Sequence, residues 1–408
     1  MKCRFCQADL EDVFIDLFNS PASNSFLTFG QMNEPESFYP LKVYTCHQCF
    51  LVQVDEYKKS DTIFDSSYVY FSSYSTSWLE HARKYVDQMI ERFGFNENSR
   101  VVEVASNDGY LLQYFVQKNI PVLGIEPASN TAEVAKSRGV DSVTDFFGVR
   151  LAKELSARNI KADLLLGNNV LAHVPDIVDF TGGLKILLSE KGMVTMEFPH
   201  LVQLIENNQF DTIYHEHFSY LSFTTVKTIF EAAGLEMFDV EEIPTHGGSL
   251  RIYAKHTEDI SKKISGNVSL LLEKEKTKGI ADINYYSGFQ QRALKIKVSL
   301  LEFLVEQNKK GKIVAAYGAA AKGNTLLNYC GIKGDLIDYV VDANPHKQNK
   351  FLPGSHIPVV NETHLKRHKP DFVLIFPWNI RDEIKTQLSY IKEWDGKFVT
   401  IIPEFDMS

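Results

Sequence analysis

Short apolar runs alternate with amphipathic helical patterns in two parts of the chain. The runs of the first part lie at residues 100–104, 122–126, 162–167 and 192–199. The runs of the second part lie at residues 312–317, 337–342 and 371–376. Apolar runs of this length between helical patterns are typical of buried strands in a parallel sheet. The pattern therefore predicts an α/β protein with two separate lobes.

Two helical regions lie outside these two alternating parts of the chain. Residues 78–93 carry apolar positions at helical spacing, and Gly94 follows as an end point. Residues 257–309 carry many Lys and Glu side chains at helical spacing, which is typical of long solvated helices that link domains. The predicted domains are an N-terminal domain at 1–58, a central domain at 59–256 that starts with a Tyr/Ser loop and a helix, and a helical linker with a C-terminal lobe at 257–408.

The composition limits the class of protein and its partners. The chain has 408 residues, of which 44% are hydrophobic, as expected for a globular protein with two or three domains. Its formal net charge of −9 argues against nucleic acid as a partner, because binding to the phosphate backbone needs a basic surface. The sequence shows neither an apolar span of membrane length nor the apolar core of a signal peptide, so we expect a cytoplasmic protein. A monomer is favoured, although the sequence leaves the oligomeric state open.

Four of the five cysteines form two Cys-x-x-Cys pairs, Cys3 with Cys6 and Cys46 with Cys49. Two such pairs supply four thiolates, which is a ligand set of tetrahedral Zn²⁺. A redox site would need only one pair beside a βαβ unit, and neither pair has that context. Because four thiolates leave no open coordination position, we expect this zinc to be structural.

Polar residues follow the strands of the central domain at positions suited to a nucleoside. Glu126 closes the second strand, where a carboxylate can accept hydrogen bonds from both hydroxyls of a ribose. The turn after the first strand contains a single glycine, which allows close backbone approach but does not match the Gly-x-Gly-x-x-Gly of a dinucleotide site. The residues predicted to line this pocket are Asn107, Asp108, Gly109, Glu126, Asn168 and Asn169.

Proton-handling side chains gather in residues 211–222, where Tyr214, Glu216 and His217 can all exchange protons. At extended spacing Tyr214 and Glu216 would face one side, and His215 and His217 the other. Such a cluster is also common at a hydrogen-bonded domain seam, because His and Tyr are amphipathic. The segment is therefore a candidate for catalysis or for a domain interface.

Taken together, these motifs resemble the sugar C-methyltransferases of deoxysugar biosynthesis. The resemblance rests on the cysteine pairs and on the motifs at residues 103–109, 168–174, 197–200, 214–217, 245–251 and 317–328. It covers nearly the whole chain. It implies a zinc domain, a class I S-adenosylmethionine-dependent methyltransferase core with a Rossmann-like fold, and a C-terminal Rossmann-like lobe.

The resemblance also implies a reaction and roles for individual residues. The family methylates a carbon, usually C-3, of a nucleotide-linked 4-keto-6-deoxyhexose, with thymidine diphosphate as the usual carrier. Removal of a proton beside the keto group requires a general base and hydrogen-bond donors near the developing oxyanion. By resemblance His217 is the base, Tyr214 and Glu216 place or polarise the substrate, and His173 supports the enolate. His215 is expected to be structural.

Other residues are predicted to bind the sugar nucleotide. The segment 66–77 is rich in Tyr and Ser and is either a polar linker or a loop that grips phosphates or sugar hydroxyls. In the C-terminal lobe, a strand followed by a helix N-terminus offers an anion site; alternatively, this lobe only completes the fold. The residues predicted to bind substrate are Tyr68, Tyr70, Ser72, Ser249, Arg251, Lys322 and Asn324.

Several alternatives remain open from the sequence. An O- or N-methyltransferase of a small molecule would not need an enolising base, and methylation at C-5 of the sugar occurs among the relatives. A nucleic-acid methyltransferase would need the basic patch that the chain lacks. A non-catalytic binding module would not consume S-adenosylmethionine.

Overall fold

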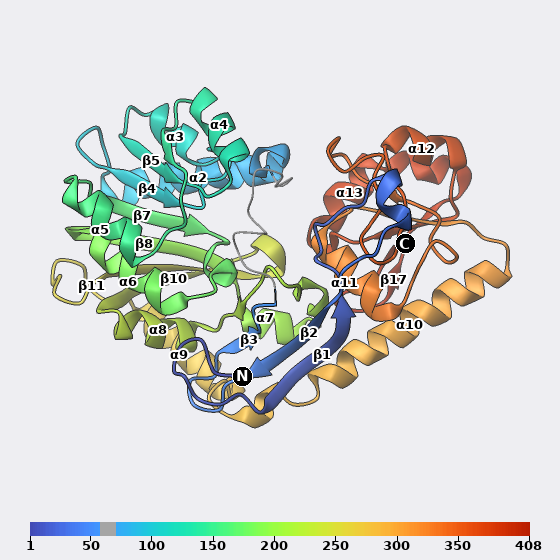
Figure 1. Ribbon diagram of the computed structural model, residues 1–408, viewed down its shortest axis with the longest axis horizontal. Coiled ribbons are helices and arrows are strands. Elements are labelled where there is room, and N and C mark those ends of the chain that lie inside the picture. The colour runs from blue at the N-terminus through green and yellow to red at the C-terminus, as the bar shows by residue number, and fades with distance from the viewer. Residues whose placement is uncertain (58–70) are drawn as a thin grey trace.

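The computed structural model describes residues 1–57 and 71–408, which form three β-sheets with helices packed around them (Figure 1). Two of the predicted substrate residues, Tyr68 and Tyr70, lie outside the described residues.

The central sheet has the strand order β10-β11-β8-β7-β4-β5-β6. Strands β8, β7, β4, β5 and β6 run parallel to one another, and β11 is antiparallel to both of its neighbours. The strands are β4 (Val101–Val104), β5 (Val122–Ile125), β6 (Ser142–Val143), β7 (Ala162–Asn168), β8 (Leu188–Pro199), β10 (Leu235–Ile243) and β11 (Ser249–His256). This sheet confirms the expected class I methyltransferase fold, and it places the ends of β4, β5 and β7 along one edge.

Helices cover both faces of the central sheet because its strands are apolar on both sides. Along β7, Leu164 and Leu166 pack into one core and Leu165 into the other. The first core is closed by α2 (Thr76–Phe93), α3 (Leu112–Val116) and α4 (Ser129–Ser137). The second is closed by α5 (Val149–Ala157), α6 (Ile177–Leu187), α8 (Phe223–Ala232) and α9 (Gly266–Lys278). Gly94 ends α2 in the left-handed conformation, with φ of 73°, as the sequence predicts.

The N-terminal domain contributes an antiparallel sheet of order β1-β2-β3-β9. Its strands are β1 (Asp12–Ser20), β2 (Tyr39–Thr45), β3 (Val52–Val54) and β9 (Ser219–Tyr220). The last strand comes from the 211–222 segment, so the N-terminal sheet holds one end of that segment. The loop between β1 and β2 reaches the C-terminal lobe, where Leu27 forms a β-bridge with Phe351.

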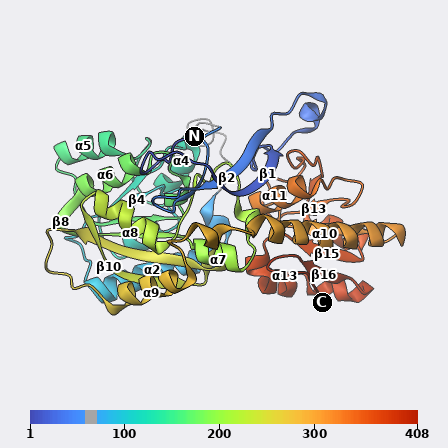
Figure 2. The same cartoon turned by 90° about the horizontal axis from the view of Figure 1, so that it is seen from below.

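The C-terminal lobe is built on a sheet of order β14-β13-β12-β15-β16-β17, which is parallel except for β17. Its strands are β12 (Val314–Tyr317), β13 (Val340–Val341), β14 (Val359–Val360), β15 (Phe372–Ile375), β16 (Lys397–Thr400) and β17 (Asp406–Met407). Its helices are α10 (Phe289–Lys309), α11 (Ala321–Cys330), α12 (Glu362–His368) and α13 (Arg381–Gln387). The short helix α7 (Leu201–Glu206) of the central domain packs into the same core as α10 and α11. The long helix α10 extends along the lobe (Figure 2).

Candidate active site

The two cysteine pairs converge in the N-terminal domain. The Sγ atoms of Cys3, Cys6, Cys46 and Cys49 all lie within 4.8 Å of one another. The Cys3–Cys49 and Cys6–Cys46 sulfur pairs are 3.6 and 3.4 Å apart, near the roughly 3.8 Å that tetrahedral bonds of about 2.3 Å would give. Gln53 Nε2 lies 3.2 Å from Cys3 Sγ and can donate to a thiolate there. This donor set fits a structural Zn²⁺ ion.

The local backbone explains why each pair presents its sulfurs together. After each Cys-x-x-Cys, the next residue is left-handed, with φ of 64° at Gln7 and 58° at Phe50. The amide of that residue donates to the carbonyl of the first cysteine of its pair, at 3.0 Å for Gln7 and 2.9 Å for Phe50. Two copies of one tight turn therefore form the metal site.

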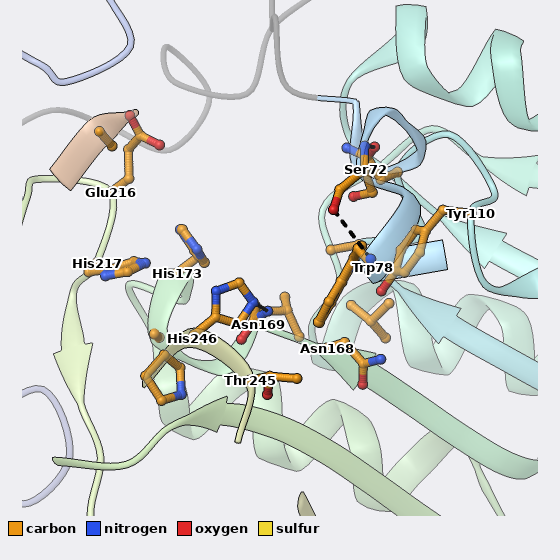
Figure 3. A pocket seen from close by; sticks show the side chains of 18 of the residues that line it. Ser72, Trp78, Tyr110, Asn168, Asn169, His173, Glu216, His217, Thr245 and His246 are labelled. Atoms are coloured by element: carbon orange, nitrogen blue, oxygen red, sulfur yellow. Dashed lines mark hydrogen bonds between the residues drawn. The ribbon is translucent and has the colours of Figure 1, made fainter. Parts of the chain in front are cut away.

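A cavity of about 680 Å³ lies at the carboxyl edge of the central parallel strands, and residues of the C-terminal lobe complete its wall (Figure 3). The predicted site residues that line it are Ser72, Asn107, Glu126, Asn168, Asn169, His173, Tyr214, Glu216, His217 and Lys322. It thus brings together residues predicted to hold a nucleoside, the proton-handling segment and the lysine of α11. Asp108, Gly109, Ser249, Arg251 and Asn324 do not line it.

The nucleoside end of the cavity is organised around Glu126. Its two carboxylate oxygens accept the backbone N–H groups of Asn107 and Ala128, each at 2.9 Å. These bonds fix the carboxylate at the cavity wall and leave lone pairs for ribose hydroxyls. Burial raises the pKa of Glu126, partly offset by these two hydrogen bonds. Glu126 therefore presents a fixed carboxylate that can accept hydrogen bonds from a diol.

Asp108 and Gly109 lie behind this wall. Asp108 is buried and accepts a hydrogen bond from Ser73 Oγ, while Arg138 Nη1 lies 3.2 Å from its Oδ2. Gly109 has φ of +74°, and a Cβ there would lie 3.2 Å from Ala135 of α4. These contacts give both residues a role in shaping the turn that presents Asn107.

Asn168 is the last residue of β7, Asn169 follows it, and both line the cavity. Asn168 is 9% exposed, and neither polar atom of its side-chain amide has a hydrogen-bond partner within the described residues. A buried amide of this kind is unfavourable unless a ligand bonds to it. Asn169 has φ of 55° and directs its Nδ2 to His246 Nε2 at 2.8 Å.

The segment that carries Tyr214, Glu216 and His217 is a turn, so the expected extended alternation is wrong. The His217 amide donates to the Tyr214 carbonyl at 2.9 Å, and this turn brings both side chains to the cavity. His215 instead points its Nε2 toward the Pro40 carbonyl, at 3.1 Å. Glu216 also reaches the cavity, where Asn24 Nδ2 lies 2.9 and 3.0 Å from its carboxylate oxygens.

Hydrogen bonds define the protonation of His217. Its Nδ1 lies 2.9 Å from the Thr212 carbonyl, which can only accept, so Nδ1 carries the hydrogen. Its Nε2 accepts a hydrogen bond from the Tyr214 hydroxyl, which lies 2.8 Å away. Burial, with repulsion from His173, holds the pKa of His217 well below its ordinary value. His217 is therefore a neutral imidazole whose basic nitrogen is Nε2.

His173 stands beside this ring. The His173 and His217 ring centroids are 4.6 Å apart at an interplanar angle of 73°. Burial lowers the pKa of His173 to about 4, so it is also neutral at neutral pH. Two neutral imidazoles thus share one end of the cavity.

The C-terminal lobe contributes Lys322 to the wall of the same cavity. Its Nζ donates to Asn379 Oδ1 at 2.7 Å and lies 4.4 Å from the ring centroid of Trp378. Trp378 Nε1 in turn donates to Asp211 at 2.8 Å. Burial lowers the pKa of Lys322, an effect that Asp211 opposes, and burial raises that of Asp211 to about 6. The lysine is therefore held within its own lobe, and the Trp378–Asp211 bond joins its surroundings to the central domain.

The remaining predicted substrate residues have partners inside the protein. Arg251 pairs with Glu197 and Glu241. Ser249 Oγ donates to the Thr245 carbonyl at 2.9 Å, and Asn324 Nδ2 donates to the Ser23 carbonyl at 2.5 Å.

The structure also adds cavity residues that the sequence patterns did not single out as site residues. Trp78 and His81 lie one turn apart on α2, with ring centroids 4.9 Å apart, and His81 Nε2 lies 2.8 Å from Glu197 Oε2. Their spacing places them on one helix face, which is the signal that could have found them. Further polar additions include Thr245, His246 and Lys347.

Comparison with known proteins identifies the family. Residues 3–64 match the family model described as "Putative zinc binding domain", residues 78–240 match "Methyltransferase domain", and residues 244–403 match "C-methyltransferase C-terminal domain". C-methyltransferase NovU of Streptomyces niveus is 35% identical over 403 residues, which cover 99% of this chain and 96% of NovU. The chain belongs to the C-methyltransferase family. This C-methyltransferase takes its methyl group from S-adenosylmethionine and carries a zinc-binding domain.

Solved structures resemble parts of the C-methyltransferase. A SAM-dependent methyltransferase from Anabaena variabilis is 15% identical over 42% of this chain and 83% of its own, with a TM-score of 0.34. Magnesium protoporphyrin IX methyltransferase of Synechocystis, solved with bound SAM, is 14% identical over 43% of this chain and 78% of its own, with a TM-score of 0.33. Within residues 1–57 and 71–408, no helix combines the length and apolar character needed to span a bilayer.

Proposed function

We propose that this C-methyltransferase methylates a carbon, most simply C-3, of a nucleoside-diphosphate-linked 4-keto-6-deoxyhexose. The observation that carries the proposal is that one cavity joins Glu126, the neutral His217 and Lys322. These residues suit, respectively, a ribose, an acidic C–H group and a diphosphate. Thymidine diphosphate is the proposed carrier, by the resemblance described above.

His217 is the proposed base. Because Nδ1–H is held by the Thr212 carbonyl, only Nε2 can take a proton. The α carbon of the sugar must approach along the direction that the Tyr214 hydroxyl takes, 2.8 Å from Nε2. Substrate binding would therefore replace this bond and free the hydroxyl to donate to the sugar. The low pKa keeps His217 in its basic form at neutral pH.

The methyl-donor end would be held by residues already in place. S-adenosylmethionine supplies an electrophilic methyl group, so the protein needs only to position it and to generate the carbon nucleophile. Glu126 would accept the ribose hydroxyls, and the Asn168 amide, which has no partner among residues 1–57 and 71–408, would bond to the same ligand. Lys322, which lines the same cavity, would meet the diphosphate.

The position of the methyl group in the product tests the proposed substrate. The enzyme is incubated with methyl-labelled S-adenosylmethionine and a panel of nucleotide-linked 4-keto-6-deoxy sugars, and the label is located by NMR. We expect the label at C-3 of a keto sugar, with the highest kcat/KM for a thymidine diphosphate carrier. Label at C-5 would correct the position, and no turnover of any keto sugar would reject this substrate class.

The base is tested by His217→Asn, with His215→Asn as the matched control. General-base catalysis contributes about 10²–10⁴-fold, so H217N should lower kcat by at least about 100-fold while S-adenosylmethionine still binds. His215 points away from the cavity, so H215N should keep its activity. Near-normal turnover by folded H217N would remove His217 from the base role.

A further inference from the structure

The loop Thr245–Gly248 has an unusual backbone. His246 lies in the left-handed region, with φ of 55° and ψ of 22°, which is unfavourable for a residue with a Cβ. Gly247 and Gly248 follow with φ of 88° and 111°. A Cβ on Gly247 would lie 2.4 Å from a ring carbon of Trp378, so the chain passes close to the C-terminal lobe here. Strained backbone of this kind is concentrated at functional sites.

This backbone turns the His246 side chain into the cavity in one defined tautomer. Asn169 Nδ2 lies 2.8 Å from His246 Nε2, and an amide nitrogen can only donate. Nε2 therefore accepts, and Nδ1 carries the hydrogen. Burial, with the positive charge of Lys322, lowers the pKa of His246 to about 4. The ring is thus a neutral N–H donor at neutral pH.

His246 lies where the two reactants must meet. In Figure 3 its ring lies between the pair His173 and His217 on one side and Trp78 on the other, and its centroid is 5.1 Å from that of Trp78. His217 also lies close enough to His246 that a positive charge on His246 would lower the pKa of His217. The keto oxygen of the substrate is attached to the carbon next to the one that loses its proton. A base at His217 therefore places that oxygen within the same part of the cavity.

We infer that His246 donates its Nδ1–H to the keto oxygen and stabilises the enolate; the inference rests on the proposed function. As Nε2 of His217 takes the proton, the C–H bonding pair becomes a C=C bond and the carbonyl π pair moves to oxygen. Attack of the α carbon on the methyl group restores the carbonyl, and the S–CH₃ bonding pair stays on sulfur. A neutral imidazole suits this task because its N–H group can donate a hydrogen bond to the developing oxyanion.

Replacing His246 by glycine separates this role from folding. Glycine adopts φ of 55° without strain, so H246G should keep the wild-type fold although it loses the contacts of the ring. Loss of one oxyanion donor lowers kcat by about 10²–10³-fold. We expect a loss of this size in α-proton exchange with heavy water, measured by NMR on thymidine-diphosphate-linked 4-keto-6-deoxyglucose without methyl donor. The dissociation constant for S-adenosylmethionine should change by less than about twofold.

Two further variants sharpen the test. Asparagine tolerates the left-handed conformation and carries an amide donor, so H246N should exchange faster than H246G. His356 also has φ of 58° but pairs with Glu36 outside the cavity, so H356G should behave as wild type. Equal exchange by H246G and wild type would overturn the role of His246. If the wild type neither exchanges nor methylates any keto sugar, the proposed function itself fails.

Discussion

Replacing Arg251 by methionine should destabilise the fold much more than it weakens substrate binding. Arg251 is 4% exposed and its partner Glu197 is 1% exposed. The Nε and Nη2 atoms of Arg251 lie 2.7 and 2.6 Å from Glu197 Oε1, and Nη1 lies 2.8 Å from Gln88 and 3.1 Å from Glu241. Burial works against the charge on Glu197, but His81 and Arg251 hold the pKa of that carboxyl below its ordinary value.

The size of the effect follows from the charge that is left behind. Methionine fills part of the arginine volume but leaves a buried carboxylate with His81 as its remaining partner. Removing one partner of a buried ion pair costs about 3–5 kcal/mol. With a shift of about 2–4 °C per kcal/mol in a domain of this size, Tm should fall by about 6–20 °C. Adding Glu197→Gln removes the unpaired charge, so the double variant should regain more than half of the lost stability.

The assay compares unfolding with catalysis in the same protein. Urea and thermal unfolding are followed by circular dichroism, and KM is measured well below the unfolding temperature. Arg83→Met is the control, because Arg83 forms an exposed pair with Glu80, and such pairs contribute about 0–1 kcal/mol. A wild-type Tm for R251M together with a large rise in KM would refute this reasoning and would support a role of Arg251 in substrate binding.

Two further predictions concern the metal and pH. Cys46→Ser should lower the zinc content and the Tm of the full chain, because β2 and β3 are joined at the metal site; an unchanged Tm with zinc lost would contradict a structural role. The pKa of His173 is lowered to about 4 from an ordinary value near 6.5, so between these pH values the unfolded chain binds more protons than the folded one. This contribution to the free energy of unfolding is complete above about pH 6.5 and is lost as pH falls toward 4. His173→Gln should therefore show a flatter dependence of the urea midpoint on pH than wild type, and parallel curves would contradict it.

Much of the framework could be predicted from residue spacing. Apolar runs of four to eight residues marked the strands of both lobes, because a strand buried on both faces must be apolar throughout. The two cysteine pairs predicted four clustered sulfurs, because each pair closes its own tight turn. The position of Glu126 at a strand end placed it at the edge of a parallel sheet. In each case the information lies within one element or its neighbours.

The residues that the sequence could not place depend on contacts between distant segments. Whether Arg251 faces a ligand or a carboxylate was decided by the pairing of β11 with β8, which puts Arg251 opposite Glu197. Asn324 bonds to Ser23 because the N-terminal domain reaches the C-terminal lobe. The turn at Tyr214–His217 replaced the expected strand because β9 begins only at Ser219.

By itself, then, the sequence determined the two α/β lobes, the metal ligands and the set of proton-handling side chains. Only the tertiary structure decided which of those side chains share the cavity, and it added Trp78, His81 and His246 to them. The physical reason is that periodicity and turn chemistry act over a few residues, whereas a cavity forms where separate elements pack. Its polar lining is therefore fixed by how the lobes meet.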